Sequence, residues 1–268
     1  MTTRDFFLGS QLPLAADDAP VSQARPAATV MLVRDAVQGI EVFMLRRARS
    51  MAFAASMLVF PGGRVDVRDT DDDLRWAGPS AQEWAQRMDC GQSEARGFVA
   101  AAVREVFEET GVLLAGTDGE GGRLADPAAR RRARAALELG EIPLSQLLEE
   151  TGTDLRSDLL TYRAHWVTPE IEPRRYDTRF FVAELPAGQE PDGDTSEAEE
   201  AAWVRPEDAL ARHADGALAL MPPTLVCLED LAAAGSVSRA MTAPPAVPRV
   251  LPYLAQTDAG PALRVELA

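Results

Sequence analysis

The sequence predicts a fold of mixed helices and strands, either α+β or α/β, in which strand hairpins flank one long central helix. Runs rich in β-branched and aromatic residues, which are typical of strands, lie at 27–34, 40–46, 159–168 and 176–185. The first two are joined by a turn that contains Gly39, as in a hairpin. A helical pattern runs from about Ser93 to Thr110 and stops at Gly111, the residue type that most often ends a helix.

The remaining elements follow in chain order. Residues 1–25 show little periodicity and predict an irregular N-terminal arm. The main domain is expected at 26–235, with an acidic, polar insertion at about 67–92 in which Ser80 caps a short helix. The tail at 236–268 holds five prolines and reads as an extension with one or two edge strands. Shorter elements are a strand at 57–60, a loop at 116–125, a helix at 126–139, a strand at 201–204, a helix from Pro206 and a helix from Pro222 to about Ala233.

Composition excludes several classes of function. The 268 residues carry a net charge of −15, whereas nucleic-acid binders usually carry an excess of basic residues, so a nucleic-acid partner is not expected. No apolar run approaches the ~18 residues of a membrane span, and no signal peptide is evident, so a cytoplasmic protein is expected. All basic residues are Arg, which leaves no Lys for a Schiff base. With only two His, a His-rich metal site is excluded. The two Cys are far apart in the sequence and are predicted to be reduced thiols.

Four arginines at 130–134 form a charge run in the helix expected at 126–139. A charge run on a helix is most often a solvated face, and that is the prediction for Arg130, Arg131, Arg132 and Arg134.

Three glutamates in the long helix share one face. At about 100° per residue, Glu105, Glu108 and Glu109 fall within an arc of about 100°, beside an apolar packing face. Like charges this close repel one another, and the C-terminal end of a helix disfavours anions. A cation would relieve both effects, and oxygen ligands select hard ions such as Mg²⁺ or Mn²⁺.

A glycine turn supplies what this helix face lacks. The segment FPGGRVD contains Gly62 and Gly63, where missing side chains allow close approach of the backbone to a partner. A carbonyl at such a turn can complete the shell of a metal ion.

Together the two segments resemble the Nudix box, G-x5-E-x7-R-E-U-x-E-E-x-G-U, where U is a bulky apolar residue. The run REVFEETGV from Arg104 matches its second half at every fixed position, and Gly63 matches its first glycine. Gly63 precedes Arg104 by 41 positions (104 minus 63), which is 27 more than the 14 of an uninterrupted box. The interrupted box resembles a branch of coenzyme A diphosphatases similar to the mammalian Nudix motif 19 enzyme.

Two glutamate positions of the family pattern are ambiguous in this sequence. The first glutamate of the box has no clean counterpart, because counting forward from Gly63 gives Asp69 and counting back from Arg104 gives Arg96. Asp66 is a further candidate for structural work in this loop. Family members also add a glutamate six residues before a tryptophan, which here is Glu197 before Trp203; Glu199 and Glu200 compete for that role.

The resemblance implies an α/β/α sandwich of the α+β class. A mixed sheet carries the catalytic loop and helix, with added helices from the insertion and the C-terminal region. The implied metal ligands are Glu105, Glu108, Glu109, the carbonyl of Gly63, and Glu197. Arg104 would orient the glutamates, and Glu105 or Glu197 would act as general base.

The implied reaction is hydrolysis of a diphosphate linkage, most directly coenzyme A or acyl-CoA to 3′,5′-ADP and a 4′-phosphopantetheine. Arginines would meet the substrate anion: Arg46, Arg47, Arg49 and Arg175. The alternatives are an ADP-ribose or NADH pyrophosphatase and an inactive Nudix module that only binds ligands. The insertion is expected at the mouth of the site, either to select the substrate or to form a contact in a homodimer.

Overall fold

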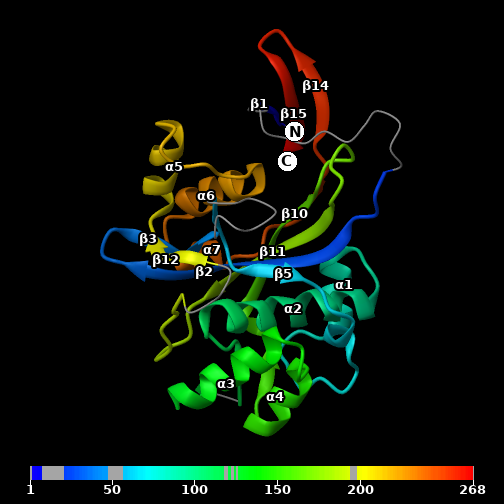
Figure 1. Cartoon of the computed structure of the whole chain (residues 1–268), viewed down its shortest axis with the longest axis vertical. Helices are drawn as coiled ribbons and strands as arrows, with labels where there is room; N and C mark the ends of the chain where they lie inside the picture. The colour runs from blue at the N-terminus through cyan, green and yellow to red at the C-terminus, as the bar shows by residue number, and fades with distance from the viewer. Residues whose placement is uncertain are drawn as a thin grey trace.

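The computed structural model describes residues 2–7, 21–47, 57–117, 120–121, 124, 126–193 and 198–267. A mixed sheet crosses the middle of the molecule, with helices above and below it (Figure 1). Its spatial order is β12 (Ala198–Val204), β3 (Gly39–Arg47), β2 (Arg25–Ala36), β11 (Tyr176–Glu184), β10 (Leu160–Val167) and β13 (Arg249–Val250). Strand β4 (Leu58–Val59) pairs with β3, and β5 (Gly62–Arg64) pairs with β2. β2 runs parallel to β11 and β10 parallel to β13, while the other neighbours are antiparallel.

Both faces of this sheet are covered, which confirms the predicted α/β/α sandwich. One apolar core lies between the sheet and the helices α1 (Ala81–Met88) and α2 (Gln92–Thr110). The other lies against α5 (Pro206–Ala214), α6 (Pro222–Ala234) and α7 (Val237–Ala240). The centre of β2 is apolar at every position from 30 to 33, because Val30 and Leu32 face the first core and Met31 and Val33 the second.

Helix α2 begins and ends close to where the sequence predicted. Gly91 is its N-cap, and Gly111 adopts φ 72° at its C-terminus while its N–H donates to the carbonyl of Phe107 at 2.9 Å. A residue with a Cβ would be strained in this left-handed conformation. The helix therefore ends immediately after Glu108 and Glu109.

The insertion is part of the core. A capping box between Ser80 and Glu83 starts α1, and Trp84 and Met88 are buried between α1, α2 and the sheet. The Trp84 ring meets the Phe181 ring of β11 edge-on, with centroids 5.9 Å apart. Full burial of a side chain such as Met88 contributes about 1.5–3 kcal/mol. The apolar face of α1 is therefore part of the core, and the position of the insertion at the mouth of the site stays a prediction.

A lower layer lies beyond α2 (Figure 1). It contains α3 (Pro127–Glu138), α4 (Leu144–Thr151) and a small sheet in the order β6 (Trp76–Ala77), β9 (Asp154–Arg156), β7 (Ala115–Thr117) and β8 (Glu120–Gly121). Short 3₁₀ turns lie at Val67–Thr70 and Ser157–Leu159. Part of the loop predicted at 116–125 is thus a short hairpin, and α4 was not predicted.

The two ends of the described chain form a separate sheet, with β15 (Gly260–Leu267) between β1 (Thr2–Phe7) and β14 (Tyr253–Thr257). Phe6 and Val265 pack toward the core that contains α6, and Arg4 pairs with Glu229 of that helix. The expected irregular arm is wrong for Thr2–Phe7. The partner strand of β1 lies near the other end of the sequence, where no local pattern reveals it.

Candidate functional site

The two segments singled out in the sequence lie against each other. Strand β5 carries Gly62 and Gly63 past the second half of α2, and the N–H of Gly62 donates to Glu109 Oε2 at 2.9 Å. A Cβ on Gly63 would lie only 2.4–2.5 Å from the carboxylate atoms of Glu105. A side chain at position 63 would therefore displace the Glu105 carboxylate from its place beside Arg104.

Arg104 joins the carboxylates into one network. Its Nη1 donates to Glu105 Oε1 at 2.8 Å and to both carboxylate oxygens of Glu108 at 3.2 and 3.1 Å. Its Nη2 also donates to the carbonyl oxygen of Arg64 at 2.8 Å. This guanidinium therefore ties α2 to the end of the glycine turn.

Asp69 holds the other side of the same guanidinium. Its two oxygens accept from Arg104 Nε and Nη2 at 3.0 and 2.9 Å, and its side chain is only 2% exposed. Asp69 also closes a capping box with Asp66 around the turn at Val67–Thr70. Asp69 stands six positions after Gly63, as the first glutamate of an uninterrupted box would, so the extra residues lie between Asp69 and Arg104.

Burial and crowding favour the protonated forms of the Glu105 and Glu108 carboxyls. Loss of solvent raises the pKa of Glu105 to about 7, with Arg104 opposing the shift and Glu108 adding to it. Burial likewise raises the pKa of Glu108, again opposed by Arg104. One guanidinium thus faces Asp69, Glu105 and Glu108, and Glu109 is buried beside them.

The donor set is of the kind that a hard divalent cation prefers, since the carboxylates of Glu105, Glu108 and Glu109 lie on the end of α2 beside the glycine turn. Among the described residues, however, no three acidic, His or Cys side chains form a ready cluster for a metal ion. Glu105 and Glu108 face Arg104, and Glu109 faces the N–H of Gly62. A bound ion would therefore share these oxygens with the groups that hold them here.

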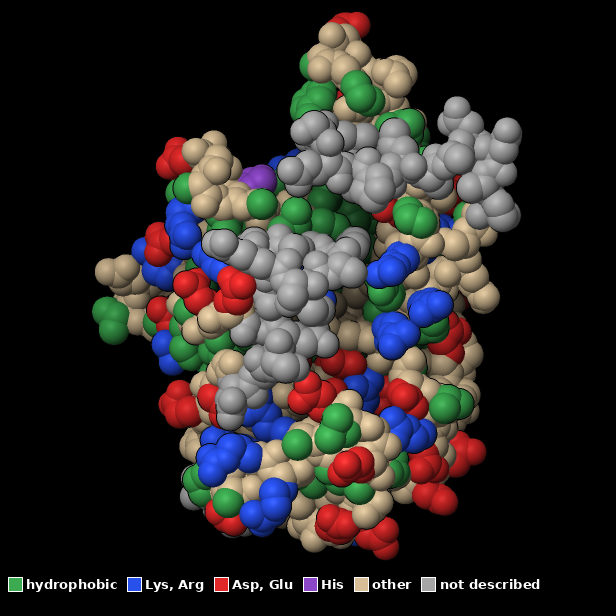
Figure 2. Space-filling view, viewed as in Figure 1, with side chains coloured by type: hydrophobic (Ala, Val, Ile, Leu, Met, Phe, Trp, Pro, Cys, Tyr) green, Lys and Arg blue, Asp and Glu red, His purple; other side chains and the backbone are tan. Residues whose placement is uncertain are grey.

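The end of α2 is also held from the lower layer. Arg134 of α3 is 5% exposed and donates from Nε and Nη2 to the carbonyl oxygen of Glu108. Arg131 and Arg132 are exposed as predicted. Basic and acidic side chains are intermixed over the lower part of the molecule (Figure 2). The prediction of a solvated face is wrong for Arg134, because it lies on the side of α3 that meets α2.

The predicted anion-binding arginines occupy different surroundings. Arg46 and Arg47 end β3, beside the strand that leads into the glycine turn, and Arg46 pairs with Glu200 at 2.9 Å. Arg175 is buried, with Nε and Nη1 donating to the carbonyls of Thr168 and Ser22, and it lines a pocket of about 460 Å³. Arg49 lies outside the described residues.

Glu197 also lies outside the described residues. Of its two competitors, Glu200 is engaged by Arg46, and Glu199 is exposed on β12.

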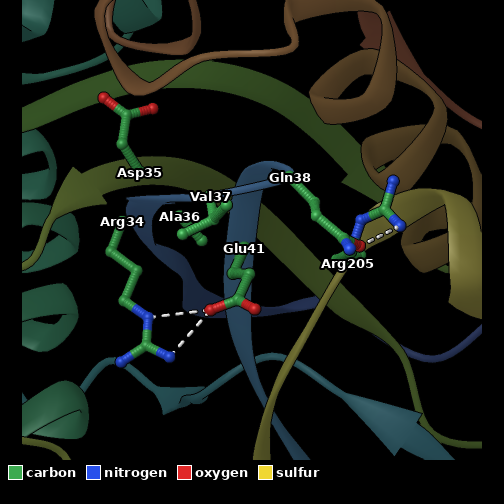
Figure 3. A pocket seen from close by; sticks show the side chains of 7 residues that line it. All are labelled: Arg34, Asp35, Ala36, Val37, Gln38, Glu41 and Arg205. Atoms are coloured by element: carbon green, nitrogen blue, oxygen red, sulfur yellow. Dashed lines mark hydrogen bonds and ion pairs between the residues drawn. The ribbon is translucent and has the colours of Figure 1, made fainter.

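Another pocket, of about 520 Å³, lies at the tip of the β2–β3 hairpin (Figure 3). Arg34 pairs there with Glu41 and Arg205 donates to Gln38. None of the box carboxylates lines it, so its size alone does not make it the functional site.

Both cysteines are free, as predicted, and the one at 227 is buried. Within the described ranges, no helix has the length and apolar character needed to cross a membrane.

Comparisons with known proteins agree with this geometry. No family model matches the chain. It is 27% identical over 212 residues to the putative nudix hydrolase 7 of Caenorhabditis elegans, covering 78% of this chain and 61% of that protein. It is 25% identical over 228 residues to the acyl-coenzyme A diphosphatase NUDT19 of Xenopus laevis, covering 71% and 59%. The chain thus spans about three fifths of the length of these curated relatives.

A solved structure gives the clearest relationship. The crystal structure of a Nudix hydrolase from Alicyclobacillus acidocaldarius is 31% identical, with a TM-score of 0.69 over 84% of this chain and 98% of that one. With its glycine turn packed on the REVFEETG helix, the chain belongs to the Nudix hydrolase family.

Proposed function

We propose that this protein hydrolyses the diphosphate linkage of a nucleoside diphosphate derivative in a reaction that depends on Mg²⁺ or Mn²⁺. The observation that carries the proposal is the buried surplus of carboxylates beside Gly63. Asp69, Glu105 and Glu108 contact Arg104 there, and Glu109 accepts from the N–H of Gly62. A fold tolerates such a surplus where a cation offsets it.

Glu105 and Glu109, one helical turn apart, would hold the ion with help from the carbonyl of Gly63. Glu108 would hold a second ion or its water, and Glu197 is a further ligand. A divalent ion at this position supplies charge neutralisation for the diphosphate and lowers the pKa of a bound water.

The chain's own residues have separate tasks. Arg104 orients Glu105 and Glu108 through charged hydrogen bonds, and Asp69 fixes the guanidinium from the opposite side. Glu105, which the resemblance names as a ligand, is also proposed as the general base. Glu197 is the alternative base.

For the substrate, we propose coenzyme A or acyl-CoA, cleaved to 3′,5′-ADP and the matching 4′-phosphopantetheine. The support comes from the name of the NUDT19 relatives and from the interrupted box. Arg46 and Arg47, beside the strand that enters the glycine turn, are suited to meet the phosphates. Arg49 and Arg175 are proposed for the same substrate on sequence grounds.

The test is a substrate panel. The protein would be incubated with Mg²⁺ or Mn²⁺ and CoA, acetyl-CoA, ADP-ribose, NADH or a dinucleoside polyphosphate, and the products separated by chromatography. We expect CoA and acetyl-CoA to be cleaved with the highest kcat/KM. Preference for ADP-ribose or NADH would overturn the substrate assignment, and binding without turnover of any compound would overturn the enzymatic proposal.

A further inference from the structure

The C-terminal turn of α2 is held by a group of side chains outside the box. Arg134 Nε and Nη2 donate to the carbonyl oxygen of Glu108 at 3.1 and 3.0 Å. The backbone N–H of Asp192 donates to the carbonyl oxygen of Thr110 at 2.9 Å. Carbonyls in the last turn of a helix lack partners within the helix, so these contacts satisfy two of them from outside.

Asp192 and Arg134 also bind each other. Arg134 Nη1 donates to Asp192 Oδ1 at 2.5 Å, and Arg130 Nη2 reaches Asp192 Oδ2 at 3.4 Å. The loop that carries Asp192 is fixed a second time by Gln189, whose side chain bonds both the N–H and the carbonyl of Leu113 at 2.9 Å. The turn of α2 is therefore clamped from two directions, by α3 and by the loop after β11.

This turn carries the carboxylates that must keep their geometry. Glu108 and Glu109 lie within it, and the negative end of the helix dipole disfavours their charge. A cation at the end of a helix offsets that effect, most strongly in a partly buried setting. Arg134 is such a cation, and its planar guanidinium makes two parallel donations that a Lys ammonium does not reproduce.

We propose that Arg134 and Asp192 are positioning residues for the carboxylate site. They hold the last turn of α2 so that Glu108 and Glu109 keep their positions beside Gly62 and Gly63. This inference rests on the proposed function, because it assigns these residues to the same ion-binding site. Neither side chain is proposed to touch the substrate or the ion.

The first measurement is the affinity of the full chain for Mn²⁺ in the absence of substrate. Electron paramagnetic resonance detects the free Mn²⁺ and so gives the fraction bound. We expect Arg134→Gln and Asp192→Asn to weaken Mn²⁺ affinity by roughly 10-fold or more, the range typical of residues that orient metal ligands. Arg134→Lys, which keeps the charge without the double donation, should recover only part of the affinity. Arg132→Gln is the matched control, since Arg132 lies on the exposed side of the same helix.

The second measurement separates positioning from plain stabilisation. At a temperature where each variant remains folded by circular dichroism, kcat with the best substrate should fall roughly 10- to 100-fold while KM changes little. A purely structural role predicts a lower Tm with native Mn²⁺ affinity and native kcat in the folded fraction, and this result would overturn the proposal.

The two proposals fail in different ways. A native protein that binds Mn²⁺ but cleaves no compound contradicts the proposed function, while loss of Mn²⁺ affinity in Arg134→Gln still supports the positioning role. Native Mn²⁺ affinity and kcat in both Arg134→Gln and Asp192→Asn overturn the positioning role alone. A native chain that neither binds Mn²⁺ nor cleaves any panel compound overturns both.

Discussion

Two charged clusters lie on the same side of the main sheet, and they are built in opposite ways. Around Arg104, the acids Asp69, Glu105 and Glu108 outnumber the cation, and the pKa of Glu105 is raised. Between β10 and β11, Asp177 contacts Arg179 and His165, and the pKa of Asp177 is lowered.

The two clusters differ in their charge balance: the Asp177 cluster is neutralised by its own residues, whereas the Arg104 cluster keeps a surplus of acidic groups. In the Asp177 cluster, one guanidinium balances one carboxylate, and the Arg179 guanidinium also stacks on the Phe98 ring at 4.7 Å. Such a cluster supports packing and needs no further ion. In the Arg104 cluster, the surplus negative charge is unfavourable by itself, which is the expected state of a site prepared for a divalent cation.

The largest expected effect is on turnover. Glu109→Gln keeps the shape of the side chain but removes one anionic ligand, so we expect kcat to fall by at least about 100-fold with the fold intact. Glu94→Gln, at the exposed start of the same helix, is the matched control. Near-native kcat in Glu109→Gln would contradict the metal-site assignment.

Removal of the Arg104 guanidinium should lower the free energy of unfolding. Arg104→Gln leaves the buried Asp69 without its ion pair, and breaking a buried pair typically costs about 3–5 kcal/mol. Urea unfolding in the absence of metal would measure the change. If Asp69→Asn is combined with Arg104→Gln, the part of this loss that comes from the unpaired Asp69 should return, while the part that comes from Glu105 and Glu108 should remain, because both also pair with Arg104. Equal stability of the single and double variants would refute the pairing argument.

The pH dependence of stability should follow the raised pKa of Glu105. Between about pH 4.5 and 7, folded Glu105 keeps a proton that the unfolded chain has lost, so the metal-free protein should become less stable as pH rises through this window. The shift corresponds to about 3 kcal/mol at most. Denaturation in EDTA at several pH values measures this slope, which Glu105→Gln should flatten and excess Mg²⁺ should reverse. A slope of the opposite sign in EDTA would rule out the protonated buried carboxyl.

The smallest effect is expected in the balanced cluster. The pKa of Asp177 is lowered, so its contribution to stability is present above the unfolded value of 3.8 and is lost as the pH falls below it. Asp177→Asn should cost about 1–2 kcal/mol at neutral pH and leave kcat unchanged. If kcat fell as far as in Glu109→Gln, the distinction between the two clusters would not hold.

The parts of the molecule that local patterns describe could be predicted. Helix α2 was located to within a residue because its apolar spacing and Gly111 act over short distances. The pairing of the glycine turn with the carboxylates of α2 followed from chemistry. The helix supplies carboxylate oxygens, and the turn supplies a backbone that a partner can approach closely. The sandwich was implied by the resemblance to the Nudix box, and the two apolar cores on the two faces of the sheet confirm it.

The parts that depend on distant partners could not be predicted. Asp69 was counted but not assigned, because only the fold shows that it meets Arg104 across 35 positions. Arg134 resembles its exposed neighbours in sequence, and it differs only because α3 turns it toward the end of α2. Glu197 and Arg49 fall outside the described residues, so their roles stay predictions.

The sheet formed by β1 and β15 has a consequence for the order of events during synthesis. Asp5 is paired with Arg264, 259 positions later in the chain. At about 5–20 residues per second, the ribosome makes β15 on the order of ten seconds to a minute after β1. Strand β1 therefore has no pairing partner until β15 has been made. The carboxylate site, whose residues lie between β1 and β15 in the sequence, can form before that.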